Sequence, residues 1–336
     1  GMHESTFSGQ LKEVWDTKFK NNPQLILIVC GSVSTWIEKN IVANTGYEGR
    51  ISLDMLLEEL SLPEINAFFR NDQRMGPLEK MWLLSITGGV PMYLEEAIFF
   101  ENHFTHLVHK CFTRNEFFYN EFAKIFSEIF MKRSKTLERI VRICLEKKLS
   151  PVEIAHELKQ EQSQDLTENL KILELAGFIS RDYFFKPNGE TSKLSQIRVK
   201  DNYLRFYLKY IEPLKIRIEK GGKRINSFSE LKGYEAMLGY QFENLILANR
   251  TLLYPFLNLR DNDIISAAPF FQKKNKSNRG SCQIDLLIHS SPDVFYLCEF
   301  KCQKKIEKSI IKEVKAKFDK IKWPRRSSLR AVLIYL

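Results

Sequence analysis

Three residues near the end of the chain have the types and the spacing that metal-assisted hydrolysis requires. Asp285 is followed, after thirteen other residues, by Glu299-Phe300-Lys301. Two carboxylates held close together repel each other, and Mg²⁺ relieves that repulsion because it prefers oxygen ligands and keeps several waters. A bound cation activates one of those waters, and a neighbouring lysine steadies the negative charge that develops on a phosphate. Asp285 and Glu299 are therefore candidate metal ligands, and Lys301 is the candidate partner of the water.

The segments that carry these residues are expected to form two neighbouring strands. Residues 282–289 and 294–302 are strand-like, and the Ser-Pro-Asp sequence between them is typical of a turn. A three-residue loop there pairs Ser290 with Val294, and the same register places the two carboxylates opposite each other. The lysine shares their side of the sheet because side chains alternate along a strand. The same pattern also fits a solvated sheet face with an ion pair between strands.

A unit of three helices and a β-hairpin is expected ahead of these strands. Helical spacing of apolar residues, and a capping box with proline at Ser150-Pro151-Val152-Glu153, predict the helices. A Pro-Asn-Gly sequence predicts the hairpin turn. This order is that of a winged helix-turn-helix. The expected elements are helices at about 137–144, 150–158 and 165–176, strands at 178–185 and 194–199, and a following helix at 202–218.

The charge balance favours an acidic partner. Lys and Arg number 51 against 41 Asp and Glu, which gives a net charge of +10, and nucleic acid is the commonest acidic partner of a basic protein. The third helix offers only one lysine among acidic residues, so it also suits a protein contact, while the wing is more basic. The candidate nucleic-acid contacts are Lys171, Arg181, Lys186, Lys193 and Arg198.

The sequence pattern of the first part of the chain predicts an α/β fragment followed by helices. Residues 25–30 (LILIVC) form a continuous apolar run, which is typical of a parallel strand buried on both faces. A helix is expected at 34–41, and this strand and helix need further strands beside them to form a domain. Residues 51–130 are expected to be mostly helical, with a capping box at Ser61 and a turn at 88–91. A plain helical bundle fits this block equally well.

A helix that bears Glu243 is expected before the two acidic strands. This helix, Ile284-Asp285 and Glu299-Phe300-Lys301 together resemble the PD-(D/E)xK nuclease superfamily. The resemblance implies that Glu243 contributes to catalysis from the first helix, that Asp285 and Glu299 hold Mg²⁺, and that Lys301 serves the water. The implied elements are a helix at 234–250, a helix at 312–321 and a strand at 331–336.

Further segments resemble the archaeal-type AAA+ ATPases, whose C-terminal domain is nuclease-like. The resemblance implies that Ser32 lies at a sensor position, and Arg50 near the nucleotide or a neighbouring subunit. The segments that carry it, with the winged helix, are 25–32, Gly49-Arg50, Phe68-Phe69, 88–94 and 200–206. The expected fold is therefore a multi-domain α/β and α protein. Its expected parts are an AAA+ core remnant (1–50), a helical lid (51–130), a winged helix with a following helix (131–222) and a PD-(D/E)xK nuclease-like domain (223–336).

The motifs that hold ATP are missing from this sequence. It has no G-x-x-x-x-G-K-[ST] run and no apolar strand that ends in Asp-Glu. We therefore expect the C-terminal part of such an ATPase, which binds ATP only in a full-length form. Gly1-Met2 is read as a tag remnant. The cysteines lack zinc-site spacing, and the sequence has neither a signal peptide nor a long apolar run, so a reducing cytoplasm without a membrane partner is expected.

Three functions remain open from the sequence. The first is a Mg²⁺-dependent nuclease that the winged helix positions on DNA. The second is a regulatory module with an inactive nuclease fold, which binds DNA or a protein partner. The third is an ATPase that needs its missing N-terminal part. A small-molecule substrate is not expected.

Overall fold

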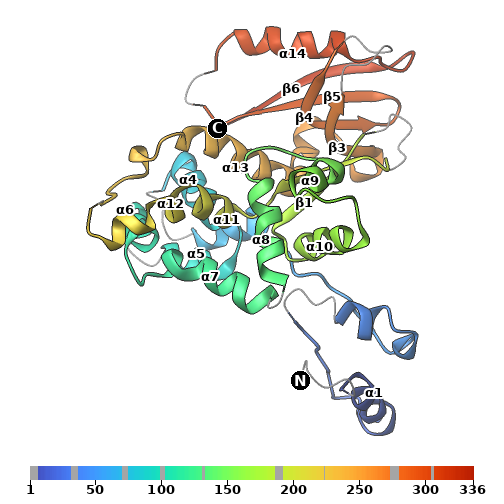
Figure 1. Ribbon diagram of the computed structural model, residues 1–336. Coiled ribbons are helices and arrows are strands. Elements are labelled where there is room, and N and C mark those ends of the chain that lie inside the picture. Colours follow the sequence, from blue (N-terminus) through green and yellow to red (C-terminus); the bar gives the residue numbers. More distant parts are fainter. Residues whose placement is uncertain are drawn as a thin grey trace.

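The structure is a computed structural model of a mixed α/β protein, in which a helical body carries a β-hairpin and a four-stranded sheet (Figure 1). No helix among the described residues is both long and apolar enough to span a membrane. The structure describes residues 7–31, 37–69, 75–98, 103–130, 133–185, 192–222, 224–272, 280–303 and 306–336.

The N-terminal residues form short helical segments that stand apart from the body in Figure 1. The predicted strand at 25–30 is wrong, because these residues are extended without a pairing strand, and Ile26 and Ile28 are 84% and 79% exposed. A parallel strand is stable only between covered neighbours, and the described residues supply none here. Of the helix predicted at 34–41, the first residues lie outside the described ones. The elements are α1 (Phe7–Thr17), η1 (Phe19–Asn21), η2 (Glu38–Val42) and η3 (Thr45–Tyr47).

The helical body follows, as predicted, but it begins later than expected. The capping box at Ser61 is present, since the Ser61 N–H donates to Glu64 Oε2 at 2.7 Å. Residues 51–60 are not helical, and the apolar side chains at 53–57 are exposed rather than buried against a core. The helices are α3 (Leu62–Phe68), α4 (Pro77–Thr87), α5 (Pro91–Ile98), α6 (His103–Phe112) and α7 (Phe117–Phe130).

The end of the 51–60 segment is fixed to the turn after α4. The Leu60 N–H donates to the Gly89 carbonyl at 2.9 Å, and the Gly89 N–H donates to Glu59 Oε2 at 3.0 Å. A Cβ at position 89 would lie 2.5 Å from the Leu60 carbonyl oxygen, so only glycine permits this approach.

The predicted order of three helices and a hairpin is present. Ser150 caps the second helix through the predicted box, and Leu149 adds a short bridge to Ile197 beside the hairpin. The predicted turn at 187–189 lies outside the described residues. The elements are α8 (Ser134–Ile143), α9 (Pro151–Glu157), α10 (Gln164–Leu175), β1 (Ile179–Tyr183) and β2 (Ser195–Val199), then α11 (Asn202–Phe206), η5 (Tyr207–Ile211) and α12 (Glu212–Glu219).

The hydrophobic core of the helical body continues beyond the Gly221-Gly222 pair. Phe228 and the first turns of the next helix, at Tyr234 and Met237, are buried in the same apolar cluster as the helical body. The segment after this pair is therefore packed rather than free. Its elements are η6 (Phe228–Glu230), α13 (Tyr234–Ala248), η7 (Arg250–Leu253), η8 (Pro255–Leu257) and η9 (Asp261–Asp263).

The four-stranded sheet lies between two helices (Figure 1). Its order is β3-β4-β5-β6, antiparallel except for the parallel pair β5–β6. Phe242 of α13 packs on one face, and Phe318 of α14 on the other. The helix predicted at 312–321 and the strand predicted at 331–336 are present with shifted ends. The elements are β3 (Ile264–Gln272), β4 (Cys282–Ser290), β5 (Val294–Lys301), α14 (Ser309–Lys320) and β6 (Ser328–Tyr335).

The hairpin β1–β2 packs against this sheet. The Phe184 ring lies 5.6 Å from the Phe271 ring, and the Phe185 ring lies 6.2 Å from the Phe295 ring. These distances are typical of packed aromatic pairs. The hairpin that the sequence predicts as a wing therefore contacts the four-stranded sheet of the same protein.

Candidate active site

The two candidate metal ligands lie on the neighbouring strands β4 and β5. Ser290 pairs with Val294, as predicted, and the register runs without interruption to Leu286 and Cys298. Asp285 and Glu299 are the next residues beyond this last pair, at a point where the β3–β4 register is irregular. Asp285 Oδ2 accepts a hydrogen bond of 2.8 Å from the N–H of Phe300. The side chain of Asp285 thus lies against the β5 backbone beside Glu299.

Glu299 is a buried carboxylate with one unused oxygen. It is 2% exposed, and its Oε2 accepts a hydrogen bond of 2.6 Å from Lys317 Nζ on α14. Its Oε1 is buried and has no hydrogen-bond partner among the described residues. Burial, and next the charge of Asp285, raise the pKa of Glu299 to about 7, against the lowering effect of Lys317. An unpaired buried oxygen of this kind is rare because it loses its water without replacement.

The pKa of Asp285 is also raised. Burial is the main cause, and the charge of Glu243 adds to it. The Phe300 N–H, Lys317 and Lys148 act in the opposite direction. Glu243, on α13, is therefore close enough to affect Asp285 electrostatically, as expected for a residue of the same site.

The nearest described partner of Glu243 is a lysine from another part of the fold. Lys148 Nζ lies 2.5 Å from Glu243 Oε1, and both side chains are largely buried. Lys148 follows α8, and its ammonium also lies 5.2 Å from the centre of the Phe271 ring on β3. In this conformation Glu243 is held by Lys148 rather than turned towards a cation. Lys148 was not predicted, because it is brought to the site only by packing between units.

Lys301 is on the expected strand, but its ammonium is directed to α14. Its Nζ lies 3.6 Å from Glu313 Oε2, and Lys317 Nζ lies 3.6 Å from Glu313 Oε1. Glu313 therefore bridges two lysines over the carboxylate pair. Lys317 was also missed from the sequence. Its signal was the spacing Ile310, Val314, Lys317, which places a cation on the apolar side of the helix.

The donor set fits a hard divalent cation. Two largely buried carboxylates lie close enough for Asp285 to raise the pKa of Glu299, and one buried oxygen has no partner among the described residues. No group of three or more His, Cys, Asp or Glu side chains is arranged for a metal within the described ranges. A cation held here by Asp285 and Glu299 would complete its shell with water, as Mg²⁺ usually does.

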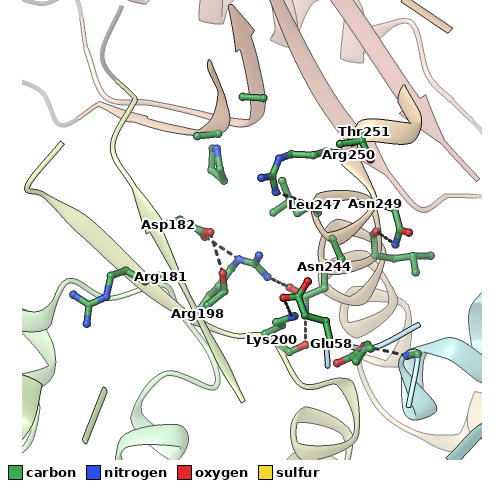
Figure 2. Close-up of a pocket in the computed structure, with 18 of the residues that line it drawn as sticks. Glu58, Arg181, Asp182, Arg198, Lys200, Asn244, Leu247, Asn249, Arg250 and Thr251 are labelled. Atoms are coloured by element: carbon green, nitrogen blue, oxygen red, sulfur yellow. Dashed lines mark hydrogen bonds and ion pairs between the residues drawn. The ribbon is translucent and has the colours of Figure 1, made fainter. Parts of the chain in front are cut away.

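Arg198 is not available to nucleic acid, so this predicted contact is wrong. It is 8% exposed, and its Nε donates to Asp182 Oδ2 at 2.8 Å. Its Nη1 donates to the side-chain oxygen of Asn244 on α13, as Figure 2 shows. The hairpin arginine is used to join β2 to α13, because a buried guanidinium needs partners for its charge and donors.

The other basic residues predicted to contact nucleic acid differ in their exposure and in their partners. Arg181 Nε lies 3.4 Å from Glu174 Oε2, so α10 neutralises it in part. Lys171 and Lys193 are exposed, on α10 and just before β2. Lys186 lies outside the described residues.

The predicted nucleotide-sensing residues are only partly described. Ser32 lies outside the described residues. Arg50 forms a two-hydrogen-bond pair with Asp16 of α1, at 2.9 and 3.0 Å. This pair joins the short N-terminal segments to each other.

The chain is similar to one archaeal protein. It is 27% identical over 262 residues to an uncharacterized protein of Methanocaldococcus jannaschii, an alignment that covers 74% of this chain. The alignment spans 56% of the relative's length. No family model matches the chain, and no solved structure matches it.

Proposed function

We propose that this protein is a divalent-cation-dependent phosphodiesterase that acts on nucleic acid. The observation that carries the proposal is the buried pair of Asp285 and Glu299, in which Glu299 Oε1 has no partner among the described residues. An oxygen in that position is stabilised when a cation takes the place of the missing donor. The resemblance of these residues to the PD-(D/E)xK pattern supports the same chemistry.

The residues of the chain have distinct roles in this proposal. Asp285 and Glu299 hold Mg²⁺, which when bound polarises a phosphate oxygen and lowers the pKa of a water. Lys301 orients that water and steadies the charge on the phosphate. Lys317 holds Glu299 Oε2 and so fixes the carboxylate in place. Glu243 joins the site after it releases Lys148.

The basic surplus supports a nucleic-acid substrate. The net charge is +10, and Lys171 and Lys193 are exposed on the three-helix and hairpin unit. We propose that DNA approaches this unit through α10, since the hairpin packs on the sheet. A winged-helix role for this unit is part of the same proposal.

Cleavage of supercoiled plasmid tests the function directly. The wild-type chain with Mg²⁺ is expected to nick and linearise the plasmid, and Asp285→Asn is expected to abolish this. Asp261→Asn removes an exposed carboxylate of the same domain and is expected to retain cleavage. Intact plasmid with both Mg²⁺ and Mn²⁺, or equal cleavage by Asp285→Asn, would reject the proposal.

A second function is favoured by the lysines around the carboxylates. Lys317 and Lys148 already neutralise Glu299 and Glu243, so the fold also suits a non-catalytic module that binds DNA. In that case the wild-type chain retards DNA without cleaving it, and added salt weakens the complex. Absence of retardation would favour a protein partner instead.

We also propose, from the resemblance to archaeal-type AAA+ ATPases, that the chain works with an ATP-binding part. The alignment spans only 56% of the archaeal relative, which is compatible with a longer protein. A P-loop encoded directly upstream in the same reading frame would support this, and its absence there would count against it.

A further inference from the structure

A cavity of about 660 Å³ lies where the hairpin and α13 meet the helical body and β3 (Figure 2). Its walls include residues 58–61, 180–185, 244–245, 247–251 and 266–269, and Lys200. Asp285 and Glu299 do not line it, so it is separate from the carboxylate site. Its volume is in the range of small-ligand sites.

The acidic residues in the cavity wall already accept hydrogen bonds or form a weak ion pair. Asp182 accepts from the Nε of Arg198 at 2.8 Å, and Glu59 accepts from the Gly89 N–H at 3.0 Å. Glu58 is exposed and lies 3.6 Å from Lys200 Nζ, a long and solvated ion pair. Such a pair contributes little and separates readily when a stronger anion approaches.

Two donor groups in the wall have incomplete partners among the described residues: the guanidinium of Arg250 has no carboxylate partner, and the hydroxyl of Ser266 has no partner. The guanidinium of Arg250 points into the cavity in Figure 2, and it has no carboxylate within ion-pair distance among the described residues. Its Nη1 donates to the Leu247 carbonyl at 3.2 Å, and its side chain also hydrogen-bonds Tyr254. The buried hydroxyl of Ser266, on β3 and also in the lining, has no partner within the described part of the chain. A guanidinium without an anionic partner and a buried hydroxyl without any partner favour a ligand that supplies acceptors.

We propose that this cavity binds the phosphate group of a ligand through Arg250, Lys200 and Ser266. A phosphate is an anion with several acceptor oxygens, and guanidinium and ammonium groups are its usual partners. The cavity is larger than a single phosphate needs, so the ligand carries further atoms. The phosphate belongs either to a free nucleotide-sized molecule or to the end of a nucleic-acid strand.

Such a ligand would join parts of the fold that are far apart in sequence. Lys200 follows β2, Arg250 follows α13, and Ser266 lies on β3. Binding is therefore expected to raise the melting temperature of the whole chain, because the folded arrangement holds the ligand and the unfolded chain does not.

Titration with pyrophosphate in metal-free buffer tests the proposal without reference to the carboxylate site. The wild-type protein and Asp285→Asn are expected to bind pyrophosphate equally and to melt at a higher temperature with it. Arg250→Gln and Lys200→Gln are each expected to weaken binding by about tenfold or more. Arg260→Gln removes an exposed arginine that does not line the cavity and is expected to bind as the wild type does.

Competition with short oligonucleotides distinguishes the two sources of phosphate. Displacement by a 5′-phosphorylated strand, but not by its 5′-hydroxyl form, assigns the cavity to a strand end. Displacement by neither assigns it to a free ligand. Equal displacement by both, no pyrophosphate binding, or unchanged binding in both folded glutamine variants would overturn the proposal.

Discussion

At the scale of single residues, the candidate site depends on how the charge of the buried Glu299 side chain is compensated. A buried carboxylate is costly unless a cation or hydrogen bonds compensate it. Lys317 supplies one such partner to Oε2, and Oε1 has none among the described residues. Glu299 is therefore only partly compensated by the protein, which is the reason for placing a cation beside it.

Lys317→Met is expected to destabilise the protein strongly at neutral pH in the absence of divalent cations. Removing one partner of a buried ion pair leaves the other uncompensated, which costs about 3 kcal/mol or more. Lys315→Met, an exposed lysine on the same helix, should change the free energy of unfolding by less than about 0.5 kcal/mol. Urea unfolding measures both. Equal, small effects in the two variants would show that Glu299 does not depend on Lys317.

Asp201 makes the stability of the protein depend on pH. Its side chain caps α11 by accepting from the Leu204 N–H at 2.7 Å. Burial, and next the charge of Glu59, raise its pKa to about 7, above the value of about 3.9 in an unfolded chain. The folded state therefore binds more protons between these values, and its contribution to stability is lost as pH rises towards 7.

Asp201→Asn is expected to flatten this pH dependence. Asparagine retains the cap but carries no charge. The change in unfolding free energy between about pH 5 and pH 8 should be smaller in the variant, by on the order of 1–3 kcal/mol. Denaturant unfolding at several pH values gives the comparison. An unchanged slope would mean that Asp201 titrates normally.

At the scale of elements, the main unexpected feature is the hairpin. Its basic residues predicted a DNA-binding wing, yet Arg198 is buried against α13, and Phe184 and Phe185 pack on the sheet. The composition of the hairpin does not distinguish these uses, since aromatic and basic residues suit both. The choice depends on the sheet it meets, which lies far away in the sequence.

Phe185→Ala is expected to lower stability by about 2 kcal/mol, because it removes ring contacts with Phe270 and Phe295. Tyr183→Ala is the matched control, since this neighbouring aromatic residue is exposed. The control should change stability by less than about 0.5 kcal/mol. Both are measured by urea unfolding. A loss no greater than in the control would show that the hairpin is not held on the sheet.

Local signals predicted most helices and the central strand pair. The capping boxes at Ser61 and Ser150 are where the sequence indicates, and the loop after Ser290 sets the register of β4 and β5 as far as Leu286 and Cys298. The apolar run at 25–30 was misassigned, because a strand exists only with hydrogen-bonded neighbours, and sequence periodicity does not reveal whether they are present. Lys148 and Lys317 were missed for a related reason, since distant packing brings them to the site.

At the scale of the whole molecule, the described parts are joined rather than separate. The core of the helical body continues into α13, and α13 then covers one face of the sheet. The ion pair of Lys148 with Glu243, the hairpin contacts and the cavity of about 660 Å³ all lie along this junction. Lys148, which follows α8 of the helical unit, is therefore paired with a residue whose charge affects Asp285.

The central claim is that Asp285 and Glu299 together bind one divalent cation. Titration of the purified chain with Mn²⁺, followed by electron paramagnetic resonance of the free ion, measures this without any need for a substrate. We expect one bound Mn²⁺ per chain in the wild type and in Asp261→Asn, and loss of binding in both Asp285→Asn and Glu299→Gln. No bound Mn²⁺ in the wild type, or equal binding in the two site variants, would contradict it.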